Sequence, residues 1–479
     1  MNRTFALPFG LALLVGAMPL ATSAQPAVSG SADDQRSTAS EVVDSAEAPI
    51  TVTHPNMRPP DRRGLNVFEP PKSDADRLGS GEPRLRVGAG FAQQFQALDH
   101  ANTAAARMVP NTTTPAPDDS LNLNELMEIG TGFNLAAANL SLDALLADGI
   151  HVNLVTYLSS RHHQEAWVKG GYIQADALRF LGVPAIDDVM NYVTIKVGHY
   201  EVNYGDAHYR RTDNGNALFN PFVGNYIMDA FTTEIGGELL VRHAGALAMV
   251  AVTGGEINGN VTAPDGRSFS VITKLGIDRQ VNPDLRLRLT GSMYHNGNAA
   301  RNTLYGGDRA GSRYFFVLEN IQATTSAQFT SGLINPGFTE EITAFQLNPF
   351  VKFHGLELFG VIERASGRAG NESEDVGRAW MQYAVDAVYR FLPNEQAYVG
   401  ARYNSVSGEL LGAPSAGQVT TAGADVSISR FQIGGGWFPT RNILLKAEYV
   451  RQQYSDFPTL DIRNGGEFNG LMVEGVINF

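Results

Sequence analysis

The sequence predicts an all-β fold: a transmembrane antiparallel up-and-down β-barrel of about sixteen strands, within a range of roughly 14 to 18. Three observations predict it. Apolar residues alternate with polar ones from residue 84 to the end, the last strand is amphipathic and ends in an aromatic residue, and the chain begins with a secretory leader. Because a bacterial single-chain barrel has an even number of strands, sixteen is favoured.

The leader covers residues 1–24. It contains Arg3, an apolar run from Leu7 to Ala21, and the small residues Ala21-Thr-Ser-Ala24. This order of basic, apolar and small-residue regions is typical of a signal peptide, and we expect cleavage after Ala24. No other stretch of the sequence reaches the roughly 18 apolar residues that a transmembrane helix needs. The chain is therefore expected in the outer membrane of a Gram-negative bacterium.

Residues 25–83 have a different character. They are rich in Ser, Ala, Asp and Pro, and proline pairs at 59–60 and 70–71 disfavour both a core and a strand ladder. We expect a flexible periplasmic N-terminal arm, followed by the barrel over residues 84–479. Within the arm, residues 64–68 are either a small docking element or an incidental apolar patch.

Strand periodicity begins at Arg84, where Leu85, Val87 and Phe91 alternate with polar or small residues. The same spacing recurs at 152–154, 167–173, 193–197, 235–241, 247–251, 271–277, 285–289, 314–318, 345–353, 356–362, 381–389, 399–403, 431–437, 443–449 and 471–479. In the segment 314–318 the alternating residues are Tyr314, Phe316 and Leu318.

The links between these segments alternate in length. Short turns rich in Asn, Pro and Asp fall at Val281–Asp284, Leu392–Glu395 and Pro439–Asn442, and longer polar links lie between them, such as 254–269 and 407–427. Short turns at one end and long loops at the other are typical of the periplasmic and extracellular ends of an outer-membrane barrel. A soluble barrel or sandwich would not be expected to alternate so regularly.

The last strand carries Val473, Ile477 and Phe479 on one apolar face. A terminal aromatic residue at the end of such a strand resembles the C-terminal signature of bacterial outer-membrane barrels. The resemblance implies that these residues form an assembly signal for the barrel-assembly machinery. The alternative is an ordinary amphipathic last strand of a soluble sandwich.

Composition excludes several functions. The chain has no Cys, which excludes disulfides, thiolate metal sites and cysteine nucleophiles, and its net charge of -13 argues against nucleic-acid binding. His162-His163-Gln164-Glu165 lacks the HExxH spacing, so a rim loop is favoured over a metal site. Ser292, His295 and Asn296 are compatible with a lipid hydrolase, but no G-x-S-x-G motif accompanies them. We expect no enzyme activity, metal or cofactor.

Two segments resemble a known family. Val197-Gly-His-Tyr-Glu-Val-Asn-Tyr-Gly205, and the stretch from Arg430 to Tyr449, resemble the phosphate-selective porin O and P family and related general porins. The resemblance covers roughly residues 84–479 and implies a sixteen-stranded, trimeric, water-filled barrel. It does not transfer the phosphate ligands, because no dense Arg or Lys ladder stands at matching positions.

Charged residues on the strand faces opposite the apolar series are expected to face the lumen. Since Arg or Lys on the lipid face would cost about 2–4 kcal/mol at the bilayer midplane, this segregation itself indicates a bilayer. The principal lumen-facing charges are Lys196, Lys274, Arg286, Arg288, Arg430, Lys446 and Glu448. The expected wall is mixed and slightly basic.

The link from Glu201 to Asp229 is densely polar and aromatic. Porins narrow their channel with a loop folded inward, and opposed Arg and Asp side chains there filter solutes. The candidates for this constriction are Asp206, His208, Arg210, Arg211 and Asp213. The alternative is a solvated loop whose charges only keep it soluble.

Together these patterns predict a passive diffusion channel for small hydrophilic or ionic solutes. The expected partners are outer-membrane lipids, lipopolysaccharide, the barrel-assembly machinery and further copies of the chain in a homotrimer. The alternative is a non-channel barrel, either an adhesin or structural protein or, less favoured, a surface lipid hydrolase.

Overall fold

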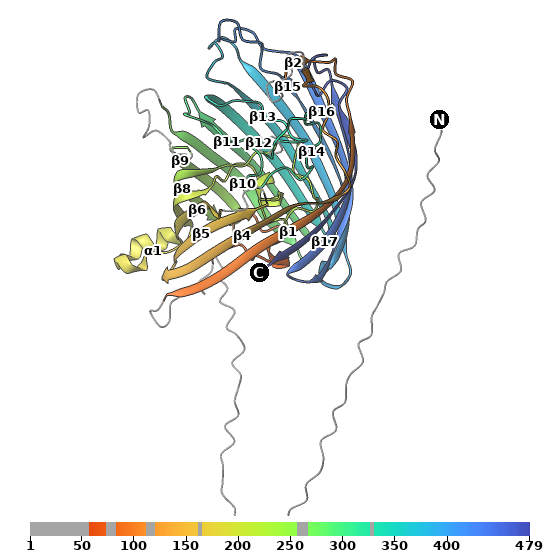
Figure 1. Cartoon of the computed structure of the whole chain (residues 1–479). Coiled ribbons are helices and arrows are strands. Elements are labelled where there is room, and N and C mark those ends of the chain that lie inside the picture. The colour runs from red at the N-terminus through yellow and green to blue at the C-terminus, as the bar shows by residue number, and fades with distance from the viewer. Residues whose placement is uncertain (1–56, 73–82, 112–119, 161–164, 256–266, 326–329) are drawn as a thin grey trace, which may run out of the picture. The chain divides into compact units, whose positions relative to one another are not determined.

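A computed structural model describes residues 57–72, 83–111, 120–160, 165–255, 267–325 and 330–479. The expected signal peptide, most of the expected arm and the His162-His163 pair lie outside these ranges. Within them, sixteen strands close an antiparallel barrel in which β1 pairs with β18 (Figure 1). The predicted fold class and strand number are confirmed.

The barrel strands are β1 (Arg84–Ala101), β4 (Gly132–Ala147), β5 (Ile150–Ser159), β6 (Trp167–Ala175), β7 (Val193–Glu201), β8 (Thr233–His243), β9 (Ala246–Thr253), β10 (Ser270–Asn282), β11 (Leu285–Asn296), β12 (Glu341–Phe353), β13 (Leu356–Arg368), β14 (Arg378–Phe391), β15 (Ala397–Glu409), β16 (Asp425–Thr440), β17 (Ile443–Ser455) and β18 (Glu467–Asn478). A separate two-stranded sheet pairs β2 (Met108–Pro110) with β3 (Ser120–Asn122).

One expected strand is wrong and one strand was not expected. Tyr314, Phe316 and Leu318 lie in the link between β11 and β12, where φ is 60° at Phe316 and 53° at Leu318. Such left-handed backbone cannot continue a strand. In contrast, β4 contains the alanine run 136–138, whose small residues gave no alternation to detect. The two errors offset each other in the strand count.

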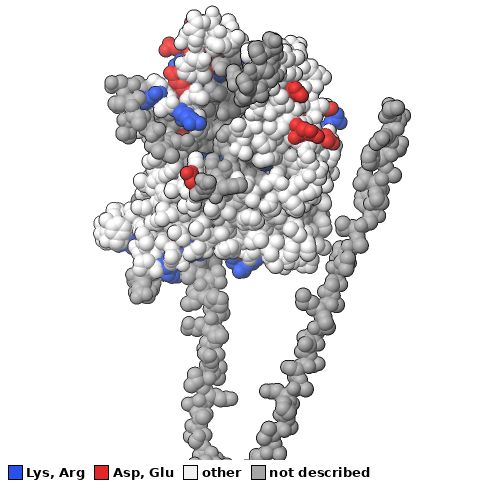
Figure 2. Space-filling model, in the orientation of Figure 1, with Lys and Arg blue, Asp and Glu red and all other residues white. Residues whose placement is uncertain are grey.

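The outer face of the barrel is apolar. Alternate residues such as Leu347, Val385 and Leu445 are exposed there, while their neighbours point inward. Figure 2 shows a largely uncharged barrel face with charged residues gathered toward its two rims. A closed sheet pairs all its strands and meets lipid with apolar side chains, so this protein is an outer-membrane β-barrel.

Among the described residues, no helix is long and apolar enough to cross a membrane.

The two ends of the barrel differ. Short turns join β4 to β5, β8 to β9, β10 to β11, β12 to β13, β14 to β15 and β16 to β17. At this short-turn end the link between β6 and β7 is longer and carries α1 (Pro184–Met190), which Figure 1 shows outside the barrel wall. The opposite, long-link end holds the extended loops. This arrangement agrees with the predicted alternation of turn lengths.

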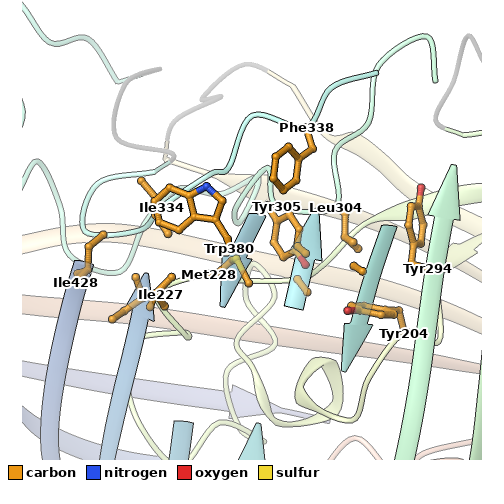
Figure 3. Packing of buried hydrophobic residues seen from close by; sticks show 14 of the residues in the cluster. Tyr204, Ile227, Met228, Tyr294, Leu304, Tyr305, Ile334, Phe338, Trp380 and Ile428 are labelled. Carbon is orange, nitrogen blue, oxygen red and sulfur yellow. The ribbon is translucent and has the colours of Figure 1, made fainter. Parts of the chain in front are cut away.

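Segments outside the strands pack inside the barrel. The inward loop (residues 202–232, between β7 and β8) and the link 297–340 both contribute to a buried apolar cluster. In Figure 3, Ile227 and Met228 of the inward loop lie near Ile334 of the link and Trp380 of β14. A third element, residues 57–72, also contacts the inner wall and is called the lumen segment below.

Candidate functional site: a charged hollow beside the inward loop

Polar side chains of the barrel wall hold the inward loop in place. Lys446 Nζ donates to the backbone carbonyls of Ala217, Asn220 and Phe222 at 3.0, 3.1 and 2.8 Å. Arg430 Nη1 donates to the carbonyl of residue 225 at 2.5 Å. A loop without regular structure must satisfy its backbone groups elsewhere, and here the wall supplies the partners.

The wall also accepts hydrogen bonds from the loop. Asn404 Oδ1 accepts from the Ile227 amide at 2.7 Å, and Glu448 Oε2 accepts from the Val223 amide at 2.7 Å. Both residues point inward from their strands, and both are fully buried. Lumen-facing charges such as Glu448 therefore lie beneath the loop and position it.

A cluster of four buried charges joins the barrel wall, the inward loop and the lumen segment. Arg288 of β11 binds Asp206 of the inward loop through two hydrogen bonds of 2.8 Å. Lys274 of β10 lies 2.7 Å from Asp206 and 2.9 Å from Glu69 of the lumen segment. Arg288 also lies 2.7 Å from Glu69. The cluster has two charges of each sign, so its members compensate one another in the interior.

The neighbouring arginines of the inward loop face different surroundings. Arg210 contacts Glu357 of β13 at 3.4 Å and hydrogen-bonds to Asn66 of the lumen segment. Arg211 forms a two-point pair with Asp229 at 2.8 and 2.6 Å, within the loop itself. Of these two adjacent residues, Arg210 therefore binds the loop to the wall and the lumen segment, and Arg211 binds two parts of the loop to each other.

Beside the loop lies a hollow of about 340 Å³. It is bounded by β1, β4, β5, β6, β7, the start of β8 and β18, by the inward loop and by the lumen segment. Its charged lining consists of Arg58, Arg86, Asp143, Lys169, Lys196, Glu201, Arg211 and Asp213, together with the ring nitrogens of His199 and His208.

Some of the residues expected from sequence line this hollow. These are Lys196, His208, Arg211 and Asp213. The others face the interior elsewhere, beneath the loop or the lumen segment: Asp206, Arg210, Lys274, Arg286, Arg288, Arg430, Lys446 and Glu448. The expected set therefore divides into residues that line the hollow and residues that support the loop or the lumen segment.

Sequence reasoning missed five charged residues of the lining: Arg58, Arg86, Asp143, Lys169 and Glu201. Arg86 could have been found, since it occupies the polar phase of a strand that opens with Leu85 and Val87. Arg58 gave no signal, because it lies in a stretch without periodicity.

Most cations of the hollow are ion-paired. Arg86 Nη2 lies 2.7 Å from Asp143 Oδ2, and Lys196 Nζ lies 3.4 Å from Glu238 Oε1. Lys169 pairs with Asp213 across the hollow's edge. On the acidic side, Glu201 Oε1 lies 2.6 Å from Nδ1 of His208. The hollow is thus lined by fixed charge pairs, which favour hydrated and ionic solutes over apolar ones.

Ion pairing keeps two side chains of the inward loop, Asp206 and Arg211, in their ionised forms. Burial disfavours the ionised carboxyl of Asp206, but Lys274 and Arg288 outweigh it and lower its pKa below the usual value. Burial likewise disfavours the charged Arg211, but Asp229 outweighs it and raises the pKa of Arg211. Both side chains remain charged at neutral pH.

Within the described ranges, no group of three or more His, Asp and Glu side chains is placed to hold a metal ion.

Comparisons with known proteins give distant structural likeness and no sequence match. No family model and no curated protein matches the chain. Similar solved structures include OmpT, an outer membrane protein of Vibrio cholerae, at 10% identity, covering 85% of this chain and 100% of that one, with a TM-score of 0.44. An anion-selective porin from Comamonas acidovorans is 9% identical, covering 83% and 100%, with a TM-score of 0.46.

A third similar structure is the outer membrane channel DcaP of Acinetobacter baumannii, at 9% identity, covering 84% of this chain and 99% of that one, with a TM-score of 0.45. At such identities and scores we draw no conclusion about function from the likeness.

Proposed function

We propose that this protein is an outer-membrane porin, a passive diffusion channel for small hydrophilic or ionic solutes. The observation that carries the proposal is the charged hollow inside a closed barrel whose outside is apolar. Lipid excludes hydrated ions, whereas a space lined by charged and hydroxyl groups can replace part of their hydration.

The family resemblance fits this proposal at a coarse level. Within the segment Val197–Gly205, His199, Tyr200, Glu201 and Asn203 line the hollow. We extend the resemblance to a general porin and not to phosphate recognition, because the cations of the hollow are interleaved with carboxylates. The proposal includes no enzyme activity.

The proposal also covers partners. Outer-membrane lipids and lipopolysaccharide would surround the barrel, and a homotrimer would be its assembled form. Phe479, Ile477 and Val473 are exposed on the outer face at the end of the chain, with Phe479 59% exposed. They are therefore accessible to the barrel-assembly machinery.

Planar-bilayer recording of the purified protein tests the function. We expect stepwise ohmic currents from the wild type and a smaller conductance from Ser141→Trp, because Ser141 lines the hollow. Leu142→Trp is the matched control. The side chain of Leu142, next to Ser141 in the strand, faces lipid, so this substitution should leave conductance unchanged. Equal conductance of both variants would show that the hollow is not the path.

A second candidate function is a non-channel barrel, such as an adhesin or structural protein. The packing inside the barrel favours it, because residues of the inward loop, the link 297–340 and the lumen segment belong to buried clusters with the inner wall. A correctly folded barrel that gives no current would support this alternative.

A further inference from the structure

The lumen segment crosses the interior at the short-turn end. Near its start, the Arg62 amide donates to the carbonyl of Arg441, in the turn between β16 and β17, at 2.9 Å. At its end, Lys72 Nζ donates to the carbonyl of Asp176, just after β6, at 2.8 Å. These two strand turns lie far apart around the barrel.

Between its ends the segment follows the inner wall. Arg286 of β11 donates to the carbonyl of Asn66 at 2.8 Å, and Arg242 of β8 donates to the carbonyl of Glu69 at 3.2 Å. The Glu69 carboxylate joins the four-charge cluster described above. The segment is therefore bound to the wall at several separate points.

An aromatic anchor reinforces this binding. Phe68 is 1% exposed and packs against the rings of Phe350 and Tyr209, with centroid distances of 5.4 and 5.8 Å. The guanidinium carbon of Arg288 lies 4.3 Å from the Phe68 ring centroid. Such apolar burial next to a compensated charge cluster specifies one docked position.

The docked segment forms one side of the hollow. Met57, Arg58, Pro60, Phe68 and Pro70 all belong to its lining. Without these residues, that side of the hollow would be open to the rest of the lumen at the short-turn end.

Arg58 differs from the other cations of the hollow. Its Nε donates to the carbonyl of Gly64 and its Nη1 to the carbonyl of Tyr209, each at 2.9 Å. Its guanidinium carbon lies 3.6 Å from the ring centroid of Phe219. Among the described residues, no carboxylate lies within ion-pair distance of it, whereas Arg86, Lys169, Lys196 and Arg211 each have one.

We propose that residues 57–72 are a selectivity insert, and that Arg58 biases the hollow toward small anions. The inference rests on the proposed channel function. Arg86, Lys169, Lys196 and Arg211 each have a carboxylate partner, so within the described part of the chain Arg58 is the cation of the lining that has none. Glu201 also lines the hollow and acts on Arg58 electrostatically, but it is paired with His208. Removing the charge of Arg58 therefore leaves the hollow more negative. A charge bordering a narrow space acts on every ion that enters it, because little water lies between them to screen it.

Reversal potentials in a tenfold KCl gradient test the role of Arg58. Arg58→Gln keeps a polar side chain of similar length, and we expect it to shift the reversal potential toward cation preference. Arg63→Gln is the matched control, because Arg63 lies on the same segment, pairs with Asp61 at 2.7 Å and is 48% exposed without lining the hollow. A conducting wild type whose reversal potential is the same as that of Arg58→Gln would overturn the inference.

The absence of Cys from the sequence allows a second, independent measurement. In Arg58→Cys, methanethiosulfonate reagents carrying trimethylammonium or sulfonate should shift selectivity in opposite directions, toward anions and toward cations respectively. A lack of effect from both reagents on an open channel would place residue 58 outside the path and overturn the inference.

Releasing the insert gives a third readout. Phe68→Ala combined with Glu69→Gln removes the aromatic anchor and one member of the charge cluster, so we expect a larger conductance and loss of the Arg58 effect. Unchanged conductance with a retained Arg58 effect would show that the segment does not need these anchors and would overturn its role as an insert. A silent wild-type barrel, by contrast, would overturn the proposed channel function itself.

Discussion

Arg288 shows how much of this interior depends on one side chain. It binds Asp206 through two hydrogen bonds, lies 2.7 Å from Glu69 and covers the Phe68 ring. It therefore connects the wall, the inward loop and the lumen segment at a single point. Removing it would leave two buried carboxylates to share the ammonium group of Lys274.

Arg288→Met should lower the free energy of unfolding by about 3–5 kcal/mol, which is the usual cost of removing one partner of a buried ion pair and leaving the other charge uncompensated. Urea unfolding of the folded barrel, followed by tryptophan fluorescence, measures this loss. Arg451→Met is the control, because Arg451 and Glu467 are 3.9 Å apart and about half exposed. A surface pair of this kind contributes about 0–1 kcal/mol. Similar losses for both variants would contradict the assigned role of the charge cluster.

The acids of the cluster predict how docking depends on pH. Burial disfavours ionised Glu69, but Lys274 and Arg288 outweigh it and hold its pKa below the usual value, as they do for Asp206. A carboxyl whose pKa is lowered on folding contributes stability above its unfolded pKa and loses it as pH falls through the lowered value. Docking of the lumen segment should therefore be unchanged from pH 8 to pH 5.

A nitroxide label on Val67→Cys measures this docking. Its spectrum should report an immobilised label from pH 8 to pH 5, and a mobile label only at much more acidic pH. A label on Asp284→Cys, in an exposed turn, provides the mobile reference. Release of the segment near pH 5 would show that its carboxylates are not stabilised as the charge cluster implies.

At the scale of elements, β18 combines two roles. It pairs with β17 on one side and β1 on the other, and so closes the barrel. The backbone of Phe479 continues this pairing through hydrogen bonds with Ala89 in both directions at 2.9 Å, while its side chain faces outward. The residue is therefore available for recognition while its backbone supports the seam.

Deleting Phe479 should abolish assembly, while Phe479→Tyr should preserve it, because the tyrosine keeps the aromatic ring on the outer face. Heat-modifiable migration on unboiled gels reports a folded barrel. A normal yield of the fast-migrating form from the deletion variant would exclude Phe479 as the assembly signal.

Elements differed in how well the sequence predicted them. Alternation placed most strands correctly, because lipid outside and protein or water inside impose a period of two on each of them. The same spacing in Tyr314, Phe316 and Leu318 misled, since the three residues pack inside the link 297–340 and Tyr314 donates to Glu448 at 2.7 Å. Apolar spacing alone does not distinguish a lipid-facing strand from a buried loop.

The candidate site was only partly predictable. The polar density of the inward loop indicated its importance, but spacing could not show that Arg210 and Arg211 face different partners. These orientations depend on contacts with β13 and with Asp229 that are set by the tertiary structure. The role of Arg58 depends on where the lumen segment docks, which no local pattern encodes.

At the scale of the whole molecule, the net charge of -13 contrasts with the hollow, whose lining has more cationic than carboxylate side chains. Five cationic and three carboxylate side chains line the hollow. At 1 M salt the Debye length is about 3 Å, so the acidic residues on the surface should contribute little to the potential inside the hollow. We expect near-neutral or anion-leaning selectivity, measured as a reversal potential.

Asp456→Asn provides the control for this expectation, because Asp456 is exposed beyond the end of β17. It should not change the reversal potential at 1 M salt. Strong cation preference in the wild type would show that the surface acids, and not the hollow, set selectivity.

The seam between β1 and β18 has a kinetic consequence. It joins Gly90 to Asn478, whereas every other pair of neighbouring strands in the barrel is joined by a link that is far shorter than the barrel itself. Closing a flexible loop of this length costs roughly 5 kcal/mol of chain entropy, on the scaling of (3/2)RT ln n. Contacts so distant in sequence form slowly and cannot nucleate folding. The seam should therefore be the last pairing to form, and until it does the barrel remains an open sheet with two unpaired edges, which makes its closure the step that most needs a catalyst.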